Sequence, residues 1–362
     1  MLREAGHEVH LIHTFQQPGL LLPACTPDDV PTHLLTDGRN RGKTGVAFKQ
    51  KGGYRPLAIF KLLGSLKAKA KELDLDVVHF FGFERTVAMA GMVKLMGLSC
   101  PTVATVYRRP KGKLWKKLAR FAGPLISSTQ FVCDGWANLG HQTTLARHGV
   151  VRDLYEEIRS EGHLNAKRSR VLFWRILTHS TGGDLVIEAF DKLAPEFPEL
   201  TFDFALRPNA KEQTEIVDAL AARHPNVNIF RFPYPEGVSL AKLVAESLIA
   251  VFPFRELTIE PQLAIAETLD AGTACLTSNH YSLPELTIEG ETGALVGTEN
   301  AEQLTGKLRE LLQDQTKLLA MSAAARETFQ ETWNWDSYLD QLHAAYAKVV
   351  PEISADNRAA TN

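Results

Sequence analysis

The sequence predicts an α/β fold made of two domains, each with a parallel sheet covered by helices on both faces. Its 362 residues exceed the size of one typical domain. Short apolar runs rich in β-branched and aromatic residues alternate with amphipathic helical segments. This alternation lapses over the charged residues 149–168 and then resumes, so each half of the chain is expected to form its own sheet.

The first half begins in a helix that ends at Gly6, and residues 14–56 read as loop. Apolar runs predict strands over residues 7–13, 76–81, 102–107 and 130–133. Helical periodicity predicts helices over residues 57–73, 85–96 and 136–148.

The second half repeats the alternation more regularly. Strands are predicted over residues 170–175, 200–205, 227–230, 249–254 and 273–277. Helices are predicted over residues 183–193, 210–224, 240–248, 261–271, 298–330 and 337–349. The expected organisation is a first domain, a linker, a second domain, a terminal helix and a disordered polar tail, over residues 1–155, 156–168, 169–333, 334–350 and 351–362.

Composition narrows the class of protein. A formal net charge of −2 gives no general reason to expect a nucleic-acid partner. The four cysteines are widely spaced, which argues against a disulfide framework and a cysteine zinc site. We find no run of about 18 apolar residues and no signal-peptide pattern, so a cytoplasmic protein is expected.

Charged side chains follow the strands of the second half, where the loops of an open parallel sheet form its ligand crevice. Arg175 and Arg207 each follow a strand, and Gly182 and Gly183 precede a helix. Arginines and close-approaching helix amides suit a phosphate anion, although solvated arginines and a simple turn are the alternative. Glu267 lies on a helix rich in Ala, Leu and Ile, so its carboxylate is expected to face a ligand or a partner.

Other polar residues have an equally good structural explanation. Ser278 and Asn279 can donate to a sugar or form a turn. Glu285 can bind a ligand or favour a helix start. His79, at the end of a strand in the first half, can touch a substrate or be a satisfied buried histidine.

Residues 108–121 form the one strongly basic segment, with Leu114, Leu118 and Phe121 on one helical face. Such a segment suits peripheral contact with an anionic membrane surface, or a solvated helix, or an acceptor-phosphate site.

Four segments match motifs of a known family: residues 3–10 (REAGHEVH), residues 76–79 (DVVH), residues 264–272 (AIAETLDAG) with residues 284–286 and 290–293, and residues 333–335 (WNW). With these segments the chain resembles the GT-B glycosyltransferases of the family-4 type. The resemblance implies two Rossmann-like domains facing a central cleft and a last helix that crosses back to the first domain. It also implies retention of anomeric configuration and a donor bound by the second domain.

The resemblance assigns roles to individual residues. It implies that Glu267 holds the ribose of the donor, that Arg175 neutralises the diphosphate and that Glu260 contacts the donor sugar, with Glu256 as the alternative. It places His79 on the acceptor side. It also places Tyr107 there, at the position where many members of the family have a histidine.

The sequence also departs from the family pattern. The family's first donor-site glutamate falls on Ile259, next to Glu260, and its lysine is absent from residues 178–183. The family opens with a strand and a glycine-rich loop, which are not found here, so the first domain is expected to be incomplete at its start.

The function expected from the sequence is transfer of a sugar from a nucleotide-sugar to a glycan or lipid-linked acceptor. No metal and no cofactor besides the donor substrate are expected. The alternative is a non-catalytic GT-B-like protein that binds a sugar nucleotide or a partner. The location expected is cytoplasmic, with peripheral contact at the inner membrane face through residues 108–121.

Overall fold

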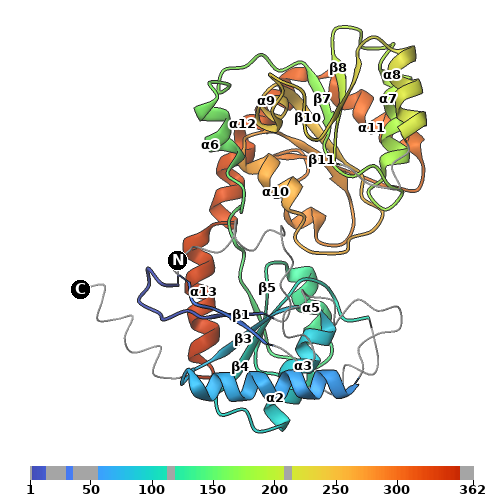
Figure 1. The fold of residues 1–362 in the computed structure, drawn as a ribbon. Helices are drawn as coiled ribbons and strands as arrows, with labels where there is room; N and C mark the ends of the chain where they lie inside the picture. Colours follow the sequence, from blue (N-terminus) through green and yellow to red (C-terminus); the bar gives the residue numbers. More distant parts are fainter. Residues whose placement is uncertain (1, 14–29, 36–55, 112–118, 208–213, 351–362) are drawn as a thin grey trace. The chain divides into compact units, whose positions relative to one another are not determined.

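The computed structural model describes residues 2–13, 30–35, 56–111, 119–207 and 214–350 (Figure 1). The chain divides into two compact units. The first unit comprises Met1–Ser127, Cys133–Ala146 and Leu339–Asn362, and the second comprises Ser128–Val132 and Arg147–Tyr338. Each is an α/β unit with parallel strands, in agreement with the predicted fold class.

The first unit contains a four-stranded parallel sheet in the order β3-β4-β5-β6 and a separate parallel pair, β1 and β2. The strands are β1 (Leu11–His13), β2 (Thr32–Leu34), β3 (Val78–Gly82), β4 (Thr102–Val106), β5 (Leu125–Ser127) and β6 (Thr143–Leu145). The helices are α2 (Pro56–Glu72), α3 (Glu84–Leu95) and the part of α5 (Gln130–Ala137) from Cys133 on. One apolar cluster joins α2 to β3 and to the end of α3 through Leu63, Val78 and Val93.

Two sequence predictions for this unit are wrong, the strand over residues 130–133 and the helix over residues 136–148. Residues 130–133, predicted as a strand, form the start of α5, and the fourth strand of the sheet is β6, within a predicted helix. The apolar run Phe131-Val132-Cys133 is short enough to fit either element. Tertiary packing decides it, because Val132, Cys133 and Trp136 are all buried at helical spacing.

The second unit contains a six-stranded parallel sheet in the order β12-β11-β10-β7-β8-β9. These strands are β7 (Arg170–Phe173), β8 (Thr201–Leu206), β9 (Val227–Arg231), β10 (Ser247–Phe252), β11 (Cys275–Ser278) and β12 (Gly293–Val296). The helices are α6 (Leu154–Ser160), α7 (Gly183–Leu193), α8 (Thr214–Arg223), α9 (Leu240–Ala245), α10 (Leu263–Asp270), α11 (Ala301–Gln313) and α12 (Gln315–Thr332), with a short 3₁₀ turn η1 (Leu283–Glu285).

Helices cover both faces of this sheet (Figure 1). Val171 and Phe173 of β7 belong to the apolar cluster with α7, α8 and α11. Leu172, between them, and Trp174 belong to the cluster with α6, α9, α10 and α12. Alternate residues of one strand therefore enter opposite cores, as a strand covered on both faces requires.

The strand order also locates a ligand crevice. The chain leaves β7 toward β8 on one side and later places β10 on the other side, so the order reverses at β7. In open α/β sheets, ligands bind at such a switch point, outside the carboxyl ends of the strands. The loops after β7 and β10 are therefore the first place to look for a site.

The last helix, α13 (Trp335–Ala347), agrees with the predicted return to the first domain, because Leu339 and the residues after it belong to the first unit. Tyr346 there lies 2.8 Å from the His79 ring, and Lys348 donates to Thr144 at 2.9 Å. Residues 156–168, predicted as a linker, include most of α6, whose Leu154 and Ile158 are buried in the second unit. The predicted tail, 351–362, lies outside the described residues.

Candidate functional site

Two loops meet at the switch point of the second unit. Gly182, at the end of the loop after β7, has φ 72°, and a Cβ there would lie 2.0 Å from the carbonyl oxygen of Pro253. The amides of Arg255 and Glu256 donate to the carbonyl of Ser180, at 2.9 and 3.1 Å. Glycine is therefore required at position 182 by both conformation and space. The close contact fixes the loop after β7 against the loop after β10.

Glu267, near these loops, is a carboxylate with a strongly raised pKa. It is only 8% exposed on α10, and burial raises the pKa of Glu267 from 4.5 to about 7. The positive charges of Arg152, Arg207 and Arg175, in that order, oppose this rise in the pKa, as does a hydrogen bond from the backbone of Arg152. A carboxylate held partly protonated at neutral pH among cations is typical of a functional site.

The three guanidinium groups near Glu267, those of Arg152, Arg175 and Arg207, are here called the arginine cluster. Arg175 follows β7 and is half-buried, and burial together with the nearby charge of Arg207 lowers its pKa. Its Nη2 donates to Gln262 Oε1 at 3.5 Å, and its guanidinium lies 6.0 Å from the centre of the Phe254 ring. Arg207, after β8, is exposed. These three cations, with one buried carboxylate, suit an anionic ligand that also carries hydroxyl groups.

Arg152 and Tyr234 belong to this site, and the sequence analysis missed both. Arg152 lies before α6 and is held by Glu157 through two hydrogen bonds of 2.8 and 2.6 Å. Tyr234 lies in the loop after β9, and burial raises the pKa of its hydroxyl, whereas Arg207 and Arg152 lower it. Arg152 falls in the charged stretch 149–168, where the alternation of strands and helices lapses, so no strand-end argument could select it. Tyr234 follows Pro233 in the loop after β9, a signal that strand-end reasoning could have used.

The two candidates for the donor-sugar glutamate differ in burial. Glu260 is 3% exposed, and Gln262, two residues later, accepts from Arg175. Glu256 is exposed. The structure brings Glu267 together with arginines, because the charges that act most strongly on its pKa are those of Arg152, Arg207 and Arg175.

The amides of Gly182 and Gly183 are already used within their loop. They donate to the carbonyls of His179 and Thr178, at 3.1 and 2.9 Å. Asp184, in the first turn of α7, forms an ion pair with Arg255, which also donates to the carbonyl of His179 at 3.1 Å. In this conformation the start of α7 therefore carries an ion pair, and its glycine amides are engaged by carbonyls.

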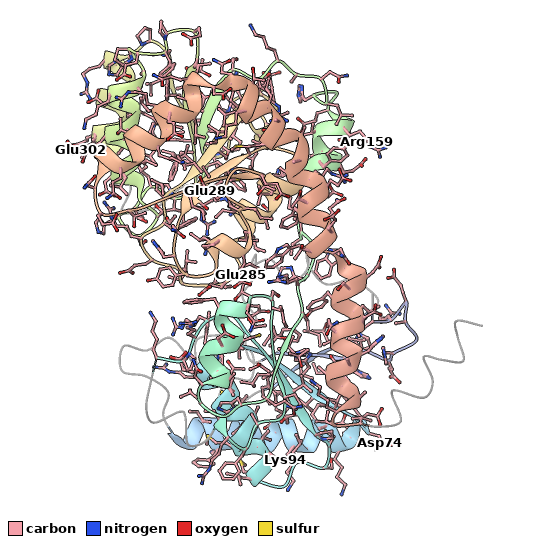
Figure 2. The ribbon with its side chains drawn as sticks, turned by 180° about the vertical axis from the view of Figure 1, so that it is seen from behind. Asp74, Lys94, Arg159, Glu285, Glu289 and Glu302 are labelled. Carbon is pink, nitrogen blue, oxygen red and sulfur yellow. The ribbon has the colours of Figure 1, made fainter. Side chains whose placement is uncertain are left out.

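The remaining predicted donor-side residues are Ser278, Asn279 and Glu285. They either bond to other parts of the protein or are exposed to solvent. Ser278 is fully buried and donates to the carbonyl of Phe254 at 2.6 Å, whereas Asn279 is exposed. Glu285 on η1, labelled in Figure 2, accepts from Arg147 at 2.9 Å and from the amides of Gln130 and Phe131 at 2.7 and 2.8 Å. The structure therefore gives Ser278 and Glu285 a role in fixing loops.

The predicted acceptor-side residues lie in the first unit. His79 bonds through its two ring nitrogens to Tyr346 and Thr105, each at 2.8 Å. Burial lowers the pKa of His79 from 6.5 to about 3, so the ring is neutral and structurally satisfied. Tyr107, half-buried after β4, packs edge to face against Phe83.

Comparisons with known proteins agree with this architecture. Residues 155–328 match the family model described as Glycosyl transferases group 1. The GDP-mannose-dependent alpha-(1-6)-phosphatidylinositol monomannoside mannosyltransferase of Mycobacterium tuberculosis is 29% identical over 125 residues, 34% of this chain. That match spans 29% of the relative's length.

Solved structures resemble nearly the whole chain. Sucrose-phosphate synthase from Thermosynechococcus elongatus aligns with a TM-score of 0.71 and 16% identity over 96% of this chain and 90% of its own. A glycosyltransferase from Rickettsia africae aligns with a TM-score of 0.72 and 16% identity over 96% and 92%. Anabaena HepE, solved in complex with UDP, aligns with a TM-score of 0.66 and 15% identity over 88% and 86%.

The family model matches sequence in the second unit, and the solved structures align with the fold of both units. The predicted resemblance to GT-B glycosyltransferases is confirmed. The chain has the two-domain GT-B fold, and its residues 155–328 match the family model of the glycosyl transferases group 1.

Proposed function

We propose that the protein is a glycosyltransferase that moves a sugar from a nucleotide-sugar to a glycan or lipid-linked acceptor. The observation that carries this proposal is the arginine cluster around Glu267 at the carboxyl edge of the second unit's sheet. Charged arginines suit the diphosphate, and the glutamate suits the hydroxyls of the ribose. Anabaena HepE binds UDP and UDP-glucose, which supports a nucleotide-sugar as the donor class.

In the proposed reaction, the bond between the sugar's anomeric carbon and the diphosphate oxygen breaks. A bond from that carbon to an acceptor hydroxyl oxygen forms, and the hydroxyl proton passes to the departing diphosphate oxygen. Negative charge grows on the departing diphosphate, where Arg175 and Arg207 offset it. Glu267 accepts from the ribose and holds the nucleotide, and Glu260 orients the donor sugar. Retention of configuration and independence of metal ions are parts of this proposal.

The acceptor is proposed to bind on the first unit, with Tyr107 as a contact residue. A lipid-linked acceptor would agree with the relative whose name includes a phosphatidylinositol monomannoside. Contact of residues 108–121 with an anionic membrane is proposed on the basis of their charge, since most of that segment lies outside the described residues. The helices that the structure describes include none long and apolar enough to cross a bilayer.

A second candidate is a non-catalytic protein that keeps the nucleotide site. Two observations favour it. Residues 178–183 lack the expected lysine, and Asp184 and Arg255 form an ion pair at the start of α7. Unless Arg255 remains in place, the carboxylate of Asp184 would repel a diphosphate at the start of α7.

Turnover separates the two candidates. UDP-glucose and GDP-mannose, each with and without a crude lipid and glycan extract, would be assayed for release of UDP or GDP. A transferase releases nucleotide from one donor, and Glu267→Ala lowers that rate at least tenfold, which corresponds to about 1.4 kcal/mol. Binding of a nucleotide-sugar without release from any extract would favour the non-catalytic candidate. Unchanged kinetics in Glu267→Ala would contradict the assigned role.

A further inference from the structure

Tyr281, directly after β11, has an unusual backbone conformation for its residue type. Its φ is 56°, in the left-handed region. Among the described residues, the other non-glycine with positive φ is Asp74, at 49°, and aspartate tolerates this region comparatively well. For a bulky side chain the conformation costs about 1–2 kcal/mol, so the surrounding structure must enforce it.

The neighbours of Tyr281 do enforce it. Ser278 Oγ donates to the carbonyl of Phe254 at 2.6 Å, and the amide of Asn279 donates to the carbonyl of Val296 at 2.9 Å. Immediately after Tyr281, Leu283 is fully buried and begins η1. The chain must therefore turn within three residues between two fixed points. A glycine would make this turn at no steric cost.

Burial of the Tyr281 ring does not offset this backbone strain. Tyr281 is 40% exposed, and its ring makes edge-to-face contacts with His280, at 4.7 Å between ring centres, and Phe131, at 5.8 Å. A residue that is strained and also exposed is a poor choice for stability alone. Such residues cluster where a ligand binds.

The position of Tyr281 connects it to the proposed donor site. Phe254 is the link, since its carbonyl accepts from Ser278 and its ring lies 6.0 Å from the guanidinium of Arg175. The loop after β11 is therefore tied to the loop after β10, which also carries Glu260. These two loops follow β10 and β11, which are neighbouring parallel strands of the sheet.

We propose that Tyr281 stacks on the glycosyl group of the nucleotide-sugar donor, against the C–H face of the sugar ring. This inference rests on the proposed function and adds a residue that selects for the sugar. An aromatic face carries partial negative charge and attracts the polarised C–H bonds of a pyranose.

The test compares free nucleotide with nucleotide-sugar. UDP and UDP-glucose, and GDP and GDP-mannose, would be titrated calorimetrically into wild type, Tyr281→Asn and Tyr281→Phe. Asparagine tolerates the left-handed conformation and removes the aromatic ring, and phenylalanine keeps it. The measured quantity is the ratio of the two Kd values within each nucleotide pair.

Tyr281→Asn is expected to weaken binding of the nucleotide-sugar about tenfold and to leave the Kd of the free nucleotide unchanged. Tyr281→Phe should keep the wild-type ratio. Tyr281→Gly should match the asparagine variant and melt at the wild-type temperature or above it, because glycine relieves the backbone cost. Asp74→Gly, at the left-handed position in the first unit (Figure 2), is the control and should change neither Kd.

Two outcomes overturn the inference by itself. In the first, Tyr281→Asn binds the free nucleotide as wild type does and keeps the wild-type ratio of the two Kd values. The other is an equal loss of affinity for both ligands with a lower melting temperature, which would make the ring a structural support. Failure of the wild type to bind any of the four nucleotides overturns the proposed function and this inference with it.

Discussion

Replacing Glu267 with glutamine should stabilise the protein in a pH-dependent way. Burial raises the pKa of Glu267 from 4.5 to about 7, so the folded state keeps a proton that the unfolded state loses. Wild-type stability contributed by this group is therefore present below about pH 4.5 and declines as pH rises to about 7. At about 1.4 kcal/mol per pKa unit, the full decline is about 3 kcal/mol.

Glutamine at position 267 cannot ionise, so the variant lacks this decline. Of the total, about 2 kcal/mol falls between pH 5.5 and 8. The difference in unfolding free energy, variant minus wild type, should grow by that amount over the interval. Urea-induced unfolding at several pH values measures it, and any pH-independent effect of the substitution cancels in the comparison.

Glu196→Gln provides a matched control with the opposite sign. Glu196 is an exposed carboxylate of the second unit whose pKa is lowered by its ion pair with Arg309. Removing this carboxylate should not make the Glu196→Gln variant more stable relative to wild type as pH rises, because a lowered pKa favours the ionised folded state. A stability difference for Glu267→Gln that stays constant from pH 5.5 to 8, or shrinks, would refute the argument that the site holds a desolvated carboxylate.

Three further predictions concern other parts of the chain. Gly182→Ala should lower the unfolding free energy by more than about 2 kcal/mol in urea titrations, because its Cβ would overlap Pro253 at positive φ. Gly272→Ala, also at positive φ but with its nearest atom at 3.7 Å, should cost about 1 kcal/mol, and equal losses would contradict the close approach. His79, with its pKa lowered from 6.5 to about 3, should cost about 2 kcal/mol of stability as pH falls from 7.5 to 5. His79→Gln should remove that dependence in thermal unfolding, and a persistent dependence would show that other groups cause it.

The sequence was most informative where period and length agreed. The buried runs around Val171 and Ile249 could be assigned to strands because helices with clear apolar faces separate them. Glu267 could be selected because a carboxylate on a helix rich in Ala, Leu and Ile needs a ligand or a partner. These arguments are local, and the second unit satisfies them almost everywhere.

The failures arise where local patterns are ambiguous. Phe131-Val132-Cys133 fits a strand by composition and became the first turn of α5, because its partners for burial lie at helical spacing. Arg152 was missed for a different reason. It reaches Glu267 from a segment outside the repeating strand and helix units, and only the tertiary fold brings the two together.

The glycine prediction shows a further limit. Gly182 and Gly183 were expected to offer amides to a phosphate, but those amides bond to carbonyls of their own loop. A sequence indicates that glycine is needed, whereas the reason, here the carbonyl of Pro253 at the switch point, depends on the other loop. Tyr281 illustrates the reverse case, because its residue type gave no sign of a left-handed backbone.

Calorimetric titration of UDP and GDP into wild type, Arg175→Ala and Arg309→Ala tests the central claim most directly. The claim is that the arginine cluster at the switch point of the second unit binds the diphosphate of a nucleotide. We predict that wild type binds at least one nucleotide, that Arg175→Ala weakens it tenfold or more, and that Arg309→Ala, in an exposed ion pair with Glu196, leaves it unchanged. Equal affinities in wild type and Arg175→Ala, or no binding by wild type, would contradict the claim.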